Sequence, residues 1–166
     1  SRIIFPVDAS TLSARGILDA DIEHAFARSG VRRFDAAALP ALNAMAAAHA
    51  LLVPLQCEFF ALEGLSQLLQ TYEQVRGSIN PELELQGIVL TMYDSRNNLS
   101  DQVVADVRQF LGDKVYETII PRNVRISEAP SYGKPAILYD LKCAGSQAYL
   151  RLASEVIKRE RKLAAA

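Results

Sequence analysis

The sequence predicts an α/β fold, with a mainly parallel sheet flanked by helices. From residue 50 onward, short apolar runs alternate with segments in which apolar residues recur at helical spacing. Strands alternating with helices of this length are typical of a parallel sheet, because parallel neighbours require a long crossover connection. Half of the 166 residues are apolar, which suits one packed domain over residues 1–161.

The first elements follow from these local patterns. Residues 1–6 (SRIIFP) are predicted as a first or edge strand, and residues 19–29 as a helix with acidic residues near its positive end. Residues 36–50 are rich in alanine and have high helix propensity. The continuous apolar run at 50–55 (ALLVPL) predicts a strand covered on both faces, and residues 61–76 an amphipathic helix.

After a break at Asn80-Pro81, the pattern repeats. Residues 85–90 are predicted as a second strand of this half, and the following helix runs to about residue 111, capped by Asn98 or Ser100. Its buried stripe is expected to contain Val103, Val104, Val107 and Phe110.

Residues 115–120 predict a third strand, which Pro121 ends. A last helix is expected to start at Ser146, with one face formed by Tyr149, Ala153, Val156 and Ile157.

Charge and cysteine content limit the functional classes. The chain has 18 basic and 19 acidic residues, so any nucleic-acid binding must come from a local patch. Cys57 and Cys143 are isolated and are expected to be reduced thiols of a cytoplasmic protein, although their spacing alone leaves a disulfide open. No apolar run reaches the roughly 20 residues of a membrane helix. Residues 162–166 (KLAAA) are interpreted as a vector-derived tail.

Three motifs from residue 50 to residue 149 point to one family. They read ALLVPLQCEFFALEGL, then GIVLTMYDSRNNLSDQVVADV, then GDKVYETIIPRNVRISEAPSYGKPAILYDLKCAGSQAY. Together they resemble the C-terminal half of the ParA/Soj partition ATPases, a branch of the ParA/MinD group of deviant P-loop proteins. The resemblance covers residues 50–161 and implies a P-loop NTPase-like fold of the ParA/MinD type. It also implies ATP and Mg as cofactors and non-specific DNA, a ParB-type protein and a second copy as partners. The expected location is cytoplasmic and nucleoid-associated, with no membrane role.

Residues 1–49 are atypical of that family. A P-loop surrounds phosphates with backbone N–H groups of glycines and adds a lysine. Here the first strand is followed by PVDASTLSARG, which has one glycine and no lysine. Either the chain is a truncation whose N-terminal half was replaced, or it is a divergent paralogue without catalysis. In both cases we do not expect it to hydrolyse ATP alone.

No catalytic or metal-binding residues are predicted. His24 and His49 are isolated in the sequence and match no catalytic or metal motif. Asp94-Ser95 and Ser127-Glu128 are interpreted as ordinary loop pairs.

Arg122, Asn123 and Arg125 are predicted at the carboxyl edge of the sheet, where open α/β folds bind ligands. The family resemblance implies that Pro121, Arg122 and Asn123 lie beside the nucleotide base. The alternative interpretation is a rigid surface loop held by its prolines.

The resemblance also implies a DNA-binding role for three cations. Arg96 lies in TMYDSRNNL, Arg125 in IPRNVR and Lys134 in SYGKP. Cations in such loops neutralise phosphates without reading sequence. The alternative is that they are solvated surface side chains.

The leading functional hypothesis is therefore a chromosome- or plasmid-partition protein of the ParA/Soj type, whose relatives bind DNA under nucleotide control. A catalytically inactive module that binds DNA or a protein partner remains open. So does a truncated fragment that self-associates through exposed sheet edges.

Overall fold

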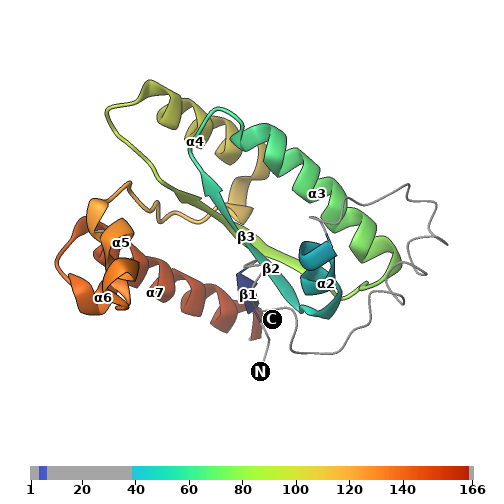
Figure 1. The fold of residues 1–166 in the computed structure, drawn as a ribbon. Helices are drawn as coiled ribbons and strands as arrows, with labels where there is room; N and C mark the ends of the chain where they lie inside the picture. The colour runs from blue at the N-terminus through green and yellow to red at the C-terminus, as the bar shows by residue number, and fades with distance from the viewer. Residues whose placement is uncertain (1–3, 7–38, 165–166) are drawn as a thin grey trace. The chain divides into compact units, whose positions relative to one another are not determined.

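Among the residues that the structure describes, three strands form the sheet, in the order β1 (Ile4–Pro6), β2 (Ala50–Gln56) and β3 (Glu84–Thr91) (Figure 1). The computed structural model describes residues 4–6 and 39–164, so the helix expected at 19–29 lies outside the described residues. β1 pairs with β2 in parallel, with Ile4 opposite Ala50. The strands predicted at 50–55 and 85–90 are confirmed, and the one predicted at 1–6 is confirmed for its described residues, 4–6. Their near-continuous apolar character explains why they were readable.

One compact unit contains residues 1–53 and 63–87. Its described helices are α2 (Leu39–Ala47) and most of α3 (Ala61–Ser78), which confirms the helix predicted at 61–76. Tyr72 on α3 donates its hydroxyl to the carbonyl oxygen of Leu83 at 3.2 Å and accepts the Leu85 N–H at 3.1 Å. These two bonds fix α3 against the start of β3.

The second unit contains residues 54–62 and 88–166. After β3 come α4 (Asn98–Leu111) and the 3₁₀ turn η3 (Gly112–Lys114). Short helices follow, and a long last helix ends the unit: α5 (Val124–Glu128), η4 (Ala129–Tyr132), α6 (Ala136–Tyr139) and α7 (Ala144–Ala164). Figure 1 shows α5 and α6 beside the first turns of α7.

The predictions for α4 need two corrections. Its N-cap is Asn97, whose side-chain oxygen accepts the N–H of Leu99 at 3.0 Å, and not Asn98 or Ser100. Asparagines 97 and 98 are adjacent, and only the first adopts the extended conformation that a cap needs. Phe110 shares the periodicity of Val103 and Val107 but is 75% exposed, because packing does not extend to the last turn of α4.

Residues 115–120 do not form the predicted regular strand. The segment makes only isolated parallel bridges, Ile88 with Val115 and Tyr93 with Pro121. Its backbone still bonds to β3, through the N–H of Tyr116 to Ile88 and the N–H of Ile120 to Leu90, both at 2.9 Å. Within the described part of the chain, further backbone groups of the segment are bound by side chains of α4 and α7, namely Arg108, Glu155 and Arg159.

The buried face of α7 differs from the predicted one. The helix begins at Ala144, two residues before Ser146, and its best buried side chains are Ser146, Ala148 and Leu152. Tyr149 and Ile157 are exposed, at 40% and 52%. The predicted and the observed buried faces of α7 are offset by one residue. Apolar periodicity alone does not distinguish them, because the buried face contains the small residues alanine and serine.

Two further observations concern the described part of the chain. None of its helices combines the length and the apolar character needed to cross a bilayer. Cys57, which is buried, and Cys143, which is half-buried, are both free thiols.

Candidate nucleic-acid interface

Two of the loops with candidate residues leave the sheet side by side. The bridge between Tyr93 and Pro121 joins the end of β3 to the end of the 115–120 segment. The N–H of Arg122 donates to the carbonyl oxygen of Tyr93 at 2.8 Å, and the N–H of Tyr93 donates to that of Ile120 at 3.2 Å. Arg96 follows Tyr93 by three residues, and Arg125 follows Pro121 by four. The backbone therefore brings these two loops to one edge of the sheet.

Arg96 is exposed but already holds an anion. Its side chain is 86% exposed. Its Nε donates to Asp94 Oδ1 at 2.9 Å and its Nη2 to Asp94 Oδ2 at 2.8 Å, which is a bidentate pair. The Arg96 backbone N–H also donates to Asp94 Oδ1, at 3.1 Å. The Asp94 carboxylate is thus held by both the backbone N–H and the guanidinium of Arg96.

Arg122 lies within the same group of charges. Its Nη2 is 3.8 Å from Glu58 Oε1, in an exposed pair of marginal length. The Arg96 guanidinium and, to a smaller degree, the charge of Arg122 hold the pKa of the Asp94 carboxyl well below its usual range. Asp94 is therefore ionised throughout the physiological pH range. At this edge of the sheet, acidic and basic side chains therefore lie in alternation: Glu58, Arg122, Asp94 and Arg96.

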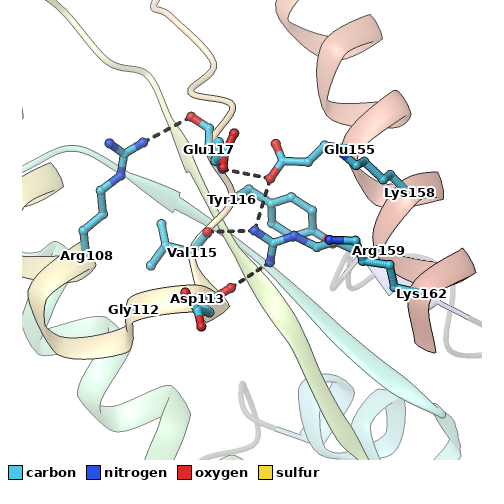
Figure 2. A pocket seen from close by; sticks show the side chains of 10 residues that line it. All are labelled: Arg108, Gly112, Asp113, Val115, Tyr116, Glu117, Glu155, Lys158, Arg159 and Lys162. Carbon is cyan, nitrogen blue, oxygen red and sulfur yellow. Dashed lines mark hydrogen bonds and ion pairs between the residues drawn. The ribbon is translucent and has the colours of Figure 1, made fainter. Parts of the chain in front are cut away.

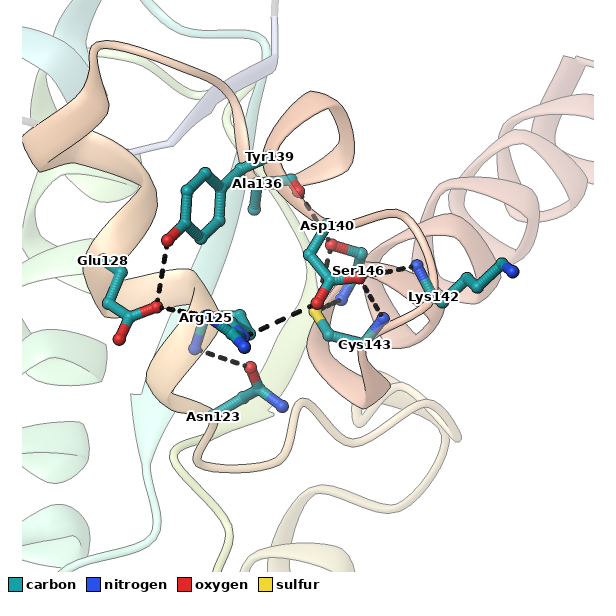
Figure 3. A network of polar contacts seen from close by, with 9 residues as sticks. All are labelled: Asn123, Arg125, Glu128, Ala136, Tyr139, Asp140, Lys142, Cys143 and Ser146. Carbon is teal, nitrogen blue, oxygen red and sulfur yellow. Dashed lines mark hydrogen bonds and ion pairs between the residues drawn. The ribbon is translucent and has the colours of Figure 1, made fainter.

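Arg125 is the centre of a second network (Figure 3). Its Nη1 donates to Glu128 Oε2 at 3.0 Å, and its Nε lies 3.6 Å from Asp140 Oδ2. Tyr139 donates its hydroxyl to the same Glu128 oxygen at 3.1 Å. The hydrogen bond from Arg125 to Glu128 is the main reason that the pKa of Arg125 is raised. The Arg125 side chain is 55% exposed, so it remains partly accessible to solvent.

The other three predicted residues have distinct surroundings. Asn123 caps α5, because its side-chain oxygen accepts the N–H of Arg125 at 3.0 Å. Pro121 makes the bridge to Tyr93. Lys134 follows Gly133, whose φ of 60° is in the left-handed region that glycine adopts without strain. The Lys134 side chain is exposed and has no ion-pair partner among residues 4–6 and 39–164.

Asp140 and Ser146 hold the segment that carries this network. Asp140 Oδ1 accepts the N–H groups of Lys142 and Cys143, at 3.0 and 3.1 Å. The Ser146 hydroxyl, which is fully buried, donates to the carbonyl oxygen of Ala136 at 3.1 Å. The two residues tie α6 to the start of α7, so the position of Asp140 beside Arg125 is set by the fold.

The sequence interpretation missed Asp94 and Glu128. It treated both as ordinary loop residues, but each binds one of the candidate arginines. Two signals were present. Asp94 stands two residues before Arg96 in a turn, and Glu128 stands three residues after Arg125, which is contact distance on a helix.

A pocket lies away from all these residues, between α7 and the start of the 115–120 segment (Figure 2). Its lining consists mainly of charged side chains, together with Gly112, Val115 and Tyr116: Arg108, Asp113, Glu117, Glu155, Lys158, Arg159 and Lys162. Glu155, Arg108 and Arg159 bind backbone groups of the segment itself. We therefore interpret the pocket as a gap left where α7 side chains bind the backbone of the 115–120 segment, and not as a ligand site.

The described residues offer no group of three histidine, cysteine or acidic side chains placed to hold a metal ion. The segment in which a phosphate-binding loop was sought, residues 6–16, lies almost wholly outside the described residues.

Comparisons with known proteins agree on one family. The family described as "CobQ/CobB/MinD/ParA nucleotide binding domain" matches residues 7–136. The chromosome partitioning protein ParA of Caulobacter vibrioides is 73% identical over 120 residues, which cover 72% of this chain and 45% of the relative. The sporulation initiation inhibitor protein Soj of Bacillus subtilis is 53% identical over 115 residues, 69% of this chain and 46% of the relative. The chain thus spans less than half the length of these relatives.

A solved structure extends the similarity to three dimensions. The cobyrinic acid a,c-diamide synthase of Mycobacterium smegmatis, crystallised with bound ADP and magnesium, aligns with a TM-score of 0.57 and 32% identity. The alignment covers 74% of this chain and 43% of that chain.

Proposed function

Because the chain belongs to the CobQ/CobB/MinD/ParA nucleotide-binding family, in its ParA/Soj-type branch, we propose that it acts in chromosome or plasmid partition by binding DNA without sequence preference. The P-loop NTPase-like α/β fold predicted from the sequence is confirmed by the same comparisons. The proposed contacts to DNA phosphates are Arg96, Arg125 and Lys134. The other proposed partners are a ParB-type protein and a second copy of the chain, at the nucleoid.

One observation carries this proposal. The Tyr93–Pro121 bridge joins the segments from which the loop of Arg96 and the loop of Arg125 leave the sheet, and both arginine side chains are more than half exposed. Cations from separate loops that share one edge can contact successive phosphates of a duplex. With few such contacts, the affinity should be weak and strongly dependent on salt.

Nucleotide binding is a separate part of the proposal. In the family, ATP and magnesium would control the switch, and Pro121, Arg122 and Asn123 would lie on the base side. The Arg122 side chain and the amide nitrogen of Asn123 can both donate to a base. Calorimetric titration of the chain with ATP and magnesium tests this part. Micromolar binding would support an ATP-switched protein, whereas no heat would favour a catalytically inactive DNA- or partner-binding module.

DNA binding is tested by fluorescence anisotropy with a labelled duplex of arbitrary sequence. Arg96→Ala, Arg125→Ala and Lys134→Ala should each weaken binding, and each should reduce the slope of log K against log salt by about 0.9. Arg151→Ala is the matched control, because Arg151 is an exposed cation on α7 outside these loops. Equal affinities for all four variants and the parent chain would contradict the proposed DNA surface.

Size-exclusion chromatography of the same variants addresses the third hypothesis. If the chain is a self-associating fragment, its oligomers should persist in Arg96→Ala and Arg125→Ala at every salt concentration, and its apparent DNA affinity should not depend on either arginine. A loss of DNA affinity at unchanged oligomeric state supports the specific surface.

A further inference from the structure

The two arginines proposed to contact DNA are not free cations. Arg96 is bound by Asp94, and Arg125 by Glu128 with Asp140 nearby. Arg122 is paired with Glu58, and Lys134 adds one more cation. Four cations therefore stand against four carboxylates at this surface, Glu58, Asp94, Glu128 and Asp140, and the local formal charge is zero. A phosphate that approaches this surface therefore meets balanced charge rather than a positive patch.

The geometry at Arg96 is that of an occupied anion site. A guanidinium binds a carboxylate or a phosphate through the same fork of two parallel N–H groups. The two oxygens of Asp94 take the fork formed by Nε and Nη2. A DNA phosphate must either displace Asp94 or bind end-on to the remaining N–H groups.

The competitor at Arg96 is permanent under physiological conditions. The Arg96 side chain holds the pKa of Asp94 well below its usual range, so protonation does not release the arginine. The backbone N–H of Arg96 binds the same carboxylate, which keeps it beside the guanidinium.

At Arg125, the two carboxylates have different roles. Asp140 is committed to the turn before α7 through its bonds to Lys142 and Cys143. Glu128 makes the shorter contact with the guanidinium, 3.0 Å against 3.6 Å, and is itself half-exposed. Glu128 is therefore the residue whose charge can be changed without dismantling the turn.

We propose that Asp94 and Glu128 set the DNA affinity of this surface, because they occupy the anion-binding sides of Arg96 and Arg125 that phosphates would otherwise take. This inference rests on the proposed function. It assigns to the two carboxylates the role of internal competitors for the DNA phosphates.

The test uses two charge-neutral variants of the whole chain, Asp94→Asn and Glu128→Gln. Both keep a side-chain oxygen, so the turn N–H of Arg96 and the hydroxyl of Tyr139 retain an acceptor. Removing one negative charge a few ångströms from a phosphate should tighten binding about fivefold. The salt slope should also steepen, by less than about 0.9 for each variant, because an arginine that is freed from its carboxylate neutralises its phosphate more completely.

Asp106→Asn is the matched control, because it changes the net charge equally on the exposed face of α4. The proposal is supported if Asp94→Asn and Glu128→Gln bind the labelled duplex more tightly than Asp106→Asn, with steeper salt slopes. It is overturned if either variant matches this control or binds more weakly than the parent chain, provided that circular dichroism shows a native fold for both. A variant that fails this check is replaced by Asp94→Ser or Glu128→Ser, which is judged by the same comparison.

The two proposals can fail separately. If Arg96→Ala and Arg125→Ala weaken DNA binding while the carboxylate variants do not strengthen it, only the competition is wrong. If the arginine variants have no effect, the DNA surface itself is wrong, and the competition is overturned with it.

Discussion

The guanidinium of Arg159 lies over the ring of Tyr116, with 3.9 Å between the guanidinium carbon and the ring centroid. From this position Arg159 donates to the carbonyl oxygens of Asp113 and Val115, at 3.0 and 2.9 Å (Figure 2). Its neighbour Glu155 accepts the N–H groups of Glu117 and Thr118, at 2.9 and 3.0 Å. Side chains of α7 therefore satisfy backbone groups that another strand would bond. This covering protects the sheet edge from pairing with other chains.

Arg159→Ala should lower the free energy of unfolding by about 1–3 kcal/mol, because it leaves two backbone carbonyls without their donor and removes the contact with Tyr116. Arg159→Lys should recover only part of this loss, since an ammonium group cannot span both carbonyls. Urea unfolding followed by circular dichroism measures the difference.

Arg151→Ala, on the exposed part of the same helix, is the control and should stay within about 0.5 kcal/mol of the parent chain. The role given to Arg159 is wrong if its alanine variant is no less stable than this control.

Glu155→Gln should make stability less dependent on pH in the acid range. Burial acts to raise the pKa of the Glu155 carboxyl, but the N–H groups of Glu117 and Thr118 and the charge of Arg159 outweigh it and leave the pKa below its ordinary value of 4.5. A lowered folded-state pKa stabilises the fold above pH 4.5, and this contribution is lost as the pH falls through the folded-state value. The variant should therefore be less stable by about 1–2 kcal/mol at neutral pH.

Urea unfolding at neutral pH and at several acid values measures this gap, which should narrow steadily below pH 4.5. Glu73→Gln, at an exposed position on α3, should differ from the parent chain by less than about 0.5 kcal/mol throughout. A gap for Glu155→Gln that is constant with pH would show that the lost charge is not the cause.

The sequence predicts the strands at 50–55 and 85–90 correctly, but it does not predict the irregular structure of the segment at 115–120. Residues 50–55 are predicted as a strand because they form a continuous apolar run, and residues 85–90 because they end in the apolar run Ile88–Leu90. The 115–120 run looks equally strand-like, but its outer edge binds Glu155 and Arg159, which lie about 40 residues later in the chain. No local pattern shows that a helix will take the place of a strand.

The candidate site shows the same division. The sequence predicted that Arg125 lies in a polar loop at the carboxyl edge, and the Tyr93–Pro121 bridge shows that the loop of Arg96 leaves the sheet beside it. It did not predict that Asp94 and Glu128 neutralise them. Such pairing depends on the turn and helix geometry within each loop, which short spacing permits but does not dictate.

Gly145→Ala should destabilise the chain, although alanine favours helices. Gly145 lies in the first turn of α7, and an added Cβ would overlap Ile126 Cδ1, lie 2.7 Å from Ile126 Cγ1 and lie 3.2 Å from Asn123 Cβ. Overpacking of this kind costs about 1–3 kcal/mol, against a helix-propensity gain of about 1 kcal/mol. The expected net loss is about 1 kcal/mol, measured by thermal or urea unfolding.

Gly64→Ala on α3 is the matched comparison, because nothing lies within 4 Å of its added Cβ. It should stabilise the chain by up to about 1 kcal/mol. Opposite signs for the two variants support close packing between α7 and the α5 loop, and a gain for Gly145→Ala would contradict it.

Cys57 should resist alkylation while Cys143 reacts. Cys57 is only 2% exposed, and burial raises the pKa of its thiol despite an opposing hydrogen bond with the Thr91 backbone. The low exposure and the raised pKa both slow the reaction of Cys57, since the thiolate is the reactive form. Near neutral pH we expect Cys57 to react about tenfold more slowly than Cys143, or slower still. Peptide mapping by mass spectrometry after timed iodoacetamide treatment measures both rates, and Cys143→Ser isolates the slow one. In urea the two thiols should react alike, so equal rates in the native chain would mean that the end of β2 opens readily.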